Sequence, residues 1–205
     1  MADTGWVIAT SYNNVAGAGT DWVSQTAMLS PAGTTDYLAC TGFGLTLASG
    51  QVFQGIEVKI GHQKSFGTGN LRDKEIRLWQ PTVGLTATDK AVTGSDWPGS
   101  MTDATYGGAS DLWDVGWTYS QLNDSSFGVY IKANEAFGAG AATAVVGDVY
   151  VKVTYIEVGS DEFTAWIASM IANLMAGSQV ASGNVSGGIG IHTGRSSSRH
   201  VPIGY

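Results

Sequence analysis

One run near the end of the chain alternates between apolar and polar side chains, and it limits the possible folds more than any other feature. In residues 148–155, every second residue from Val149 to Tyr155 is apolar. Successive side chains of a β-strand point to opposite faces, so a period of two predicts a strand with one buried and one solvated face. Residues 55–60 and 75–79 show the same period. We therefore expect strands early, centrally and late in the chain.

Shorter runs of β-branched and aromatic residues predict further strands at 37–41, 44–47, 90–93 and 127–133. The chain has 29 Gly and only 4 Pro, which suits many short strands joined by tight turns better than a helical bundle. Strands at this spacing favour a sandwich or barrel over a parallel α/β sheet. The predicted fold is all-β: an antiparallel, jelly-roll-like β-sandwich over residues 1–158.

The character of the sequence changes after Gly159. Ser160 is a suitable N-cap, Asp161 and Glu162 favour the positive end of a helix, and Gly177 is a suitable stop. Apolar residues between them recur with helical spacing and form a stripe: Phe163, Trp166, Ile167, Met170, Ile171, Leu174 and Met175. This amphipathic helix is expected either to cover the sandwich or to pack against a partner subunit.

Residues 177–205 form a Gly/Ser-rich extension that has too few apolar residues to build a core of its own. It carries Arg195 and Arg199 but no acidic residue. Two interpretations remain open: a disordered tail, or an extended arm that becomes ordered across a neighbouring subunit. The chain is thus divided into a sandwich domain, 1–158, and a helix with an arm, 159–205.

Charge and composition exclude several classes of partner. The net charge of −7 argues against coating nucleic acid, which requires clustered Lys and Arg. Cys40 is the single cysteine, so no internal disulfide can form, and it is expected to be a small buried residue. We see no secretory signal at the N-terminus and no apolar run of about 18 residues, so the expectation is a soluble protein with no membrane partner.

A search for catalytic or cofactor motifs finds none that is specific. His62, His192 and His200 lack the spacing of metal ligands, and the glycine-rich residues 187–195 lack the Lys-Ser/Thr ending of a phosphate loop. We therefore predict a non-enzymatic protein without a cofactor.

A loop-rich region combines four acids with three tryptophans, and it is the one stretch with a ligand-binding interpretation. Paired acids could hydrolyse a glycan or bind Ca²⁺, and flat indole rings could cover the apolar faces of sugars. The favoured interpretation is structural, because Asp commonly caps turns and Trp commonly lies in cores. The residues are Asp96, Asp103, Asp111, Asp114, Trp97, Trp113 and Trp117. Trp97, Trp113, Asp96 and Asp111 are the candidate glycan contacts in this alternative.

The order of several motifs resembles a β-sandwich module of bacteriophage virion proteins. The resemblance covers about residues 21–155 and rests on these motifs: Phe43-Gly44-Leu45, residues 55–60, residues 75–78, Lys90-Ala91, Asp96-Trp97-Pro98, Tyr106-Gly107-Gly108, Asp111-Leu112-Trp113, Trp117, Phe127-Gly128-Val129 and residues 148–155. The family pattern has the Trp-Pro and Tyr-Gly-Gly motifs in loops. Two positions depart from it: Gly147 stands where valine is usual, and Asp114 where glycine is usual.

This resemblance implies a structural component of a phage particle, assembled in the cytoplasm of the bacterial host. The leading hypothesis is a capsid decoration or cement protein, a homo-oligomer with a trimer favoured, that binds the major capsid protein across subunit joints. Expected contact residues are Phe163, Trp166, Ile167, Met170, Ile171, Leu174, Arg195 and Arg199. The alternatives are a tail-tip or receptor-binding module that recognises a host surface glycan, and a tail or connector ring protein.

Overall fold

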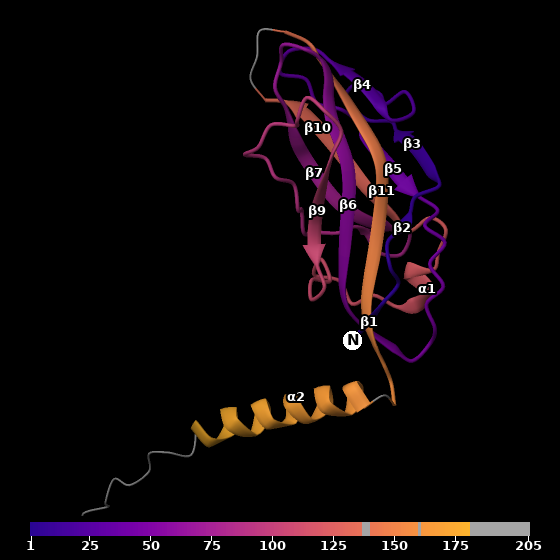
Figure 1. Ribbon diagram of the computed structural model, residues 1–205, viewed down its shortest axis with the longest axis vertical. Helices are drawn as coiled ribbons and strands as arrows, with labels where there is room; N and C mark the ends of the chain where they lie inside the picture. The colour runs from indigo at the N-terminus through magenta and orange to yellow at the C-terminus, as the bar shows by residue number, and fades with distance from the viewer. Residues whose placement is uncertain (137–139, 160, 181–205) are drawn as a thin grey trace, which may run out of the picture. The chain divides into compact units, whose positions relative to one another are not determined.

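Two long antiparallel strands form the centre of the structure. The computed structural model describes residues 1–136, 140–159 and 161–180. Within it, β6 (Gln51–Gly67) pairs with β11 (Ala142–Glu157) along almost the whole length of both strands (Figure 1). Their alternating apolar side chains, such as Val58 and Val151, are fully buried. In residues 55–60 and 148–153, the period of two therefore predicts correctly which side chains face the core.

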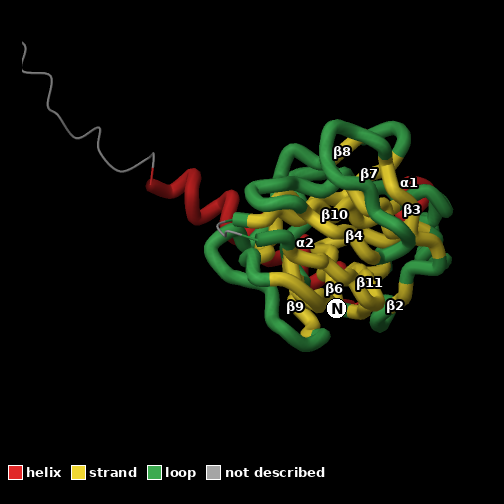
Figure 2. The backbone as a smooth tube through the Cα atoms, turned by 90° about the horizontal axis from the view of Figure 1, so that it is seen from above, coloured by secondary structure: helices red, strands yellow, loops and turns green. Residues whose placement is uncertain are grey.

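The strands form two antiparallel sheets that pack face to face, seen as two layers in Figure 2. In the first sheet, β9 and β11 flank β6, and three short strands pair with β11; its other members are β1 (Ala2–Asp3), β2 (Val7–Ile8), β4 (Thr26–Leu29) and β9 (Thr102–Gly108). The second sheet has the order β3 (Ser11–Val15), β5 (Tyr37–Thr41), β10 (Gly128–Glu135), β7 (Leu71–Gln80) and β8 (Gly84–Leu85).

The pairing of these strands follows the pattern of a jelly roll. From β4 to β11 the first strand pairs with the last, β5 pairs with β10, β6 with β9, and β7 with β8. This is one long hairpin of nested strand pairs, and it is folded so that consecutive strands lie mostly in different sheets. The predicted all-β, jelly-roll-like sandwich is confirmed.

Aromatic residues fill the core at one end of the sandwich and bridge strands on an outer face. Trp113 and Phe127 are among the largest fully buried side chains. The short helix α1 (Tyr119–Leu122), closed by a capping box at Thr118, buries Leu122 in the same core. On the outer face of the second sheet, the rings of Trp79 and Tyr130 stack with centroids 5.5 Å apart, a cross-strand pair that stabilises the sheet.

Two of the predicted strands, 44–47 and 90–93, are loops instead. Gly44 has a φ of 64°, outside the region of extended strands. The Asn123 side chain then replaces a partner strand, because its amide accepts from the Leu47 N–H and donates to the Leu47 carbonyl, both at 2.8 Å. Similarly, the N–H of Val92 donates to the Asp73 carboxylate at 2.9 Å. Side chains therefore supply hydrogen bonds that strand pairing would otherwise supply.

The predicted face of Tyr155 is changed by a β-bulge. The β6–β11 register shifts between Thr154 and Tyr155, and Thr154 is buried whereas Tyr155 is half-buried. An extra residue in one strand reverses the alternation beyond it. The simple period therefore holds only as far as Val153.

The backbone conformation and the neighbouring side chains describe the two positions, Asp114 and Gly147, that depart from the pattern of the virion module. Asp114 has a φ of 57°, a left-handed conformation that glycine adopts with less strain. Gly147 lies at a second bulge of β11, and a Cβ there would lie 3.0 Å from the Met101 sulfur. The expected location of the Tyr-Gly-Gly motif in a loop is wrong, because Tyr106, Gly107 and Gly108 end strand β9.

The chain divides into two compact units, Met1–Thr164 and Ala165–Tyr205. Helix α2 (Asp161–Val180) matches the predicted helix but continues past Gly177, so the expected stop there is wrong. The expected N-cap, Ser160, and the arm from 181 onward lie outside the described residues. No helix in the described part of the chain has the length and apolar character needed to cross a bilayer.

If the inward rows of β6 and β11 hold the sandwich together, Ile56→Ala should lower the free energy of unfolding by about 2–5 kcal/mol, the cost of a buried cavity. Ile56 is fully buried, whereas Ile8 on β2 is 39% exposed. The matched variant Ile8→Ala should therefore cost less than about 1 kcal/mol. Urea denaturation measures both, and equal losses would contradict this assignment of the core.

Candidate functional site

The two tryptophans proposed as glycan contacts are parts of the core. Trp97 is 5% exposed and Trp113 is fully buried. The Trp97 indole N–H donates to Asp73 at 2.8 Å, and that of Trp113 donates to the Ile56 carbonyl at 3.0 Å. A ring that stacks on a sugar must present a face to solvent, so the hypothesis of an exposed Trp97 and Trp113 platform is wrong.

The acids of the same region hold loops through ion pairs. Asp96 pairs with Arg72 at 2.6 Å, and Asp111 pairs with Lys90 at 2.7 Å. Burial tends to raise the pKa of Asp111, but hydrogen bonds from Lys90 and the Trp113 N–H outweigh it, so the pKa lies below its ordinary value. Asp103 pairs with Lys59, and Asp114 accepts from the Thr88 hydroxyl. Each of these four carboxylates is therefore engaged with a different partner.

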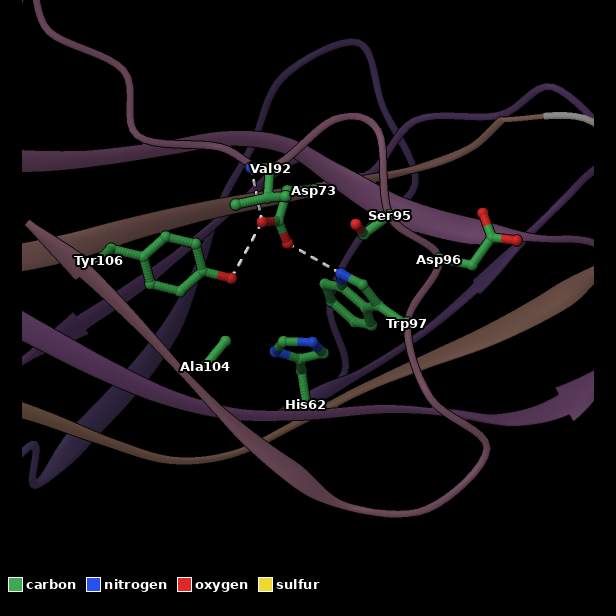
Figure 3. Close-up of a pocket in the computed structure, with 8 residues that line it drawn as sticks. All are labelled: His62, Asp73, Val92, Ser95, Asp96, Trp97, Ala104 and Tyr106. Carbon is green, nitrogen blue, oxygen red and sulfur yellow. Dashed lines mark hydrogen bonds between the residues drawn. The ribbon is translucent and has the colours of Figure 1, made fainter.

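A different carboxylate, Asp73, is the hub of the most organised polar cluster. It is 3% exposed and comes from β7. Its two oxygens accept three hydrogen bonds: from the Val92 N–H at 2.9 Å, the Trp97 indole at 2.8 Å and the Tyr106 hydroxyl at 2.9 Å (Figure 3). Because Tyr106 belongs to β9, the hub ties the second sheet to the first and to the loop between them.

A small pocket of about 130 Å³ opens beside this hub. Figure 3 shows the His62 ring beneath the Asp73 carboxylate, with the Asp96 carboxylate directed away from Asp73. His62 is 8% exposed, and its ring lies 4.8 Å from that of Trp97. The lining residues are His62, Asp73, Val92, Ser95, Asp96, Trp97, Ala104 and Tyr106.

Burial sets the electrostatics of the pocket. It lowers the pKa of His62 below its ordinary value, and the raising influences of Asp73, the Ile60 carbonyl and Asp103 do not compensate. Among the described residues, His62 Nδ1 has no partner with hydrogen-bond geometry. Burial and the neighbouring Asp73 charge raise the pKa of Tyr106. The pocket therefore brings an imidazole with a lowered pKa and a phenol with a raised pKa together beside the Asp73 side chain.

Two further kinds of site can be checked against the structure, a metal site and a reactive thiol. Within the described residues, no three His, Cys, Asp or Glu side chains are placed to hold a metal ion. Cys40 is fully buried, and burial raises the pKa of its thiol, as expected for a core residue rather than a nucleophile.

The predicted contact stripe is exposed in part. On α2, Met170 is 46%, Ile171 50% and Leu174 71% exposed, while Trp166 and Ile167 are half-buried. The side chain of Phe163, and Arg195 and Arg199 as a whole, lie outside what the structure describes. The surface role of these arginines therefore stays a prediction.

The sequence contained a signal for the pocket that the motif search missed. His62 continues the inward row of Ile56, Val58 and Ile60, and Asp73 follows the buried Leu71 with the same parity. A titratable residue at an inward position of a strand must find a polar partner or a cavity. Applying the period of two to polar residues would have marked both.

No family model and no curated protein matches the chain. Among solved structures, one described as "CBM4 structure and function" is similar, with a TM-score of 0.35 and 15% sequence identity, over 72% of this chain and 93% of the other. The likeness is too distant to indicate a ligand or an activity.

His62 should make stability depend on pH. Below about pH 6.5 the unfolded chain binds a proton at His62, whereas the buried imidazole resists it. As the pH is lowered below about 6.5, the free energy of unfolding should therefore decrease, and His62 should contribute at most about 1.4 kcal/mol of this decrease per pH unit. In the His62→Gln variant this decrease should be smaller than in the wild type, because the two proteins have all other titrating groups in common. Identical slopes by urea denaturation would contradict a neutral, buried His62.

Proposed function

We propose that this protein is a non-enzymatic structural component of a bacteriophage particle, and specifically a trimeric decoration protein that binds the capsid and stabilises the head. The apolar stripe of α2 is the observation that carries the proposal. Met170, Ile171 and Leu174 are each about half exposed or more in the single chain. Side chains of this kind, contiguous on one helix, are typical of a surface that another subunit covers.

The occupant that fits this stripe best is a second copy of the same helix. Residues 163–180 contain no charged side chain, so identical helices can pack together without burying like charges. Ile167, Met170 and Leu174 have the alternating spacing of three and four residues that coiled-coil seams use. A closed ring of three copies would bury the stripe and present three sandwiches to a shell, which adds avidity at each site.

The assignment to a phage particle rests on the resemblance in the sandwich. Its motifs occupy the framework: Phe43 and Phe127 lie in the core, while Trp97 and Tyr106 bind the Asp73 hub. These motif residues therefore support the proposal through the fold of the sandwich and not through a catalytic site. The glycan-binding alternative loses support because the aromatic residues on which it depended are buried.

A charge placed in the stripe should break the oligomer. Leu174→Lys would put an ammonium group at each copy of the seam, so the protein should shift from trimer to monomer. Ala172→Lys is the matched control, because Ala172 is exposed on the opposite side of the helix and should leave the trimer intact. Size-exclusion chromatography with light scattering measures the mass. A wild-type monomer, or equal effects of both variants, would contradict the role of α2.

Electron microscopy of intact particles with a labelled copy tests the location. The decoration role predicts label on the head at threefold-related positions, and removal of residues 160–205 should abolish it. Label at the neck or tail, or sixfold or twelvefold symmetry, would point to a connector or tail protein instead. Unchanged head occupancy after the deletion would overturn the anchoring role.

A further inference from the structure

The floor of the His62 pocket carries a buried negative charge with no positive partner among the described residues. Asp73 accepts three hydrogen bonds, and all three donors are neutral groups, the Val92 N–H, the Trp97 indole and the Tyr106 hydroxyl. Hydrogen bonds stabilise a carboxylate, but a buried charge is further stabilised by an opposite charge nearby. The nearby Arg72 guanidinium is paired with Asp96 at the rim. The pocket therefore favours a cation.

His62 restricts the kind of cation that the pocket favours. His62 is more than nine-tenths buried, lines the pocket, and leaves Nδ1 without a hydrogen-bond partner in the described structure. One nitrogen of a neutral imidazole accepts a hydrogen bond. A cation that carries N–H groups can donate to the Asp73 carboxylate and to the unprotonated ring nitrogen of His62, whichever of the two that is, whereas a cation without N–H groups would satisfy only the charge.

The walls and the mouth of the pocket suit a small organic cation. Aromatic rings of Trp97 and Tyr106 line it, and such rings attract cations through their faces. A volume of about 130 Å³ holds an alkylammonium group but not a large ligand. At the mouth, Val92 is 51% exposed and Ser95 is exposed, so the pocket can be entered from solvent.

We propose that this pocket binds a primary ammonium group, held by the Asp73 carboxylate and the His62 imidazole between the rings of Trp97 and Tyr106. An anion would meet the Asp73 charge. A divalent metal would lack ligands, because no group of three metal-binding side chains is present among the described residues. The proposal is independent of the virion role. The ammonium group comes either from a free small amine or from a lysine side chain of another protein.

Ethylammonium chloride is the direct probe, with ethanol as its neutral isostere and sodium chloride at equal ionic strength as the salt control. The full-length protein is titrated at neutral pH while the His62 ring resonances are followed by NMR. Ethylammonium should produce saturable shifts with a dissociation constant on the order of millimolar, as a ligand of three heavy atoms allows. Ethanol and sodium chloride should produce none.

Variants separate the pocket from general effects. Val92→Phe fills the mouth and should weaken binding by about tenfold or more. Val23→Phe is the matched control at a position 77% exposed outside the pocket, and it should bind as the wild type does. Asp73→Asn should abolish binding if its amide spectrum shows a folded protein, and Val92→Phe keeps the test decisive if it does not fold.

A lysine peptide and its Nε-acetylated form identify the source. If the unmodified peptide shifts His62 and the acetylated one does not, the pocket takes a lysine side chain. If only ethylammonium shifts it, the pocket takes a free amine, and the ammonium proposal still stands. Absence of a saturable ethylammonium shift, an equal response to ethanol, or unchanged binding by Val92→Phe would overturn it.

Discussion

The pairing of β6 with β11 organises the first sheet and the core. The other strands of the first sheet all pair with one of these two, and their inward rows form the surface that the second sheet covers. Each fully buried Ile or Val in these rows contributes about 1.5–3 kcal/mol relative to an exposed position. The register of this pair also decides which polar residues face inward, and so places His62 in the interior.

Buried carboxylates then attach the loops to this framework. Asp36 accepts the N–H groups of Gly17 and Gly19, both at 2.7 Å, and Asp73 joins β7 to Val92, Trp97 and Tyr106. Few charged residues are present in the chain, at 13% of the total, and several of its acids are used in this way. The region with the most acids and tryptophans is consequently a structural joint. The proposed binding surfaces are the stripe of α2 and the small pocket that Asp96 and Trp97 of this region help to line.

The sequence predicted those elements whose stability is local or periodic. Residues 55–60, 75–79 and 148–153 are predicted correctly because their alternation reflects burial directly, and α2 because its stripe has helical spacing. Residues 37–41 are predicted from their aromatic and apolar composition rather than from alternation. Residues 44–47 were misassigned because a side chain, Asn123, takes the place of a partner strand. Trp97 and Trp113 could not be placed from the sequence, since core and platform tryptophans look alike until their surroundings are known. The hydrogen bonds of Asp73 join three separate segments and could not be predicted from the sequence. The period of two does indicate, however, that His62 and Asp73 point toward the core.

Hydrogen exchange of backbone amides tests whether the loop that carries Val92 and Trp97 is a fixed part of the sandwich. The N–H of Val92 donates to Asp73, and that of Trp97 donates to the Leu71 carbonyl at 2.7 Å. Both amides should exchange with nearly the same opening free energy as Val151 at the centre of β11, because all three open only when the sandwich unfolds. Exchange of Val92 and Trp97 that is orders of magnitude faster than that of Val151 would show a loop that opens independently of the sandwich, and would contradict its fixed attachment through Asp73 and Leu71.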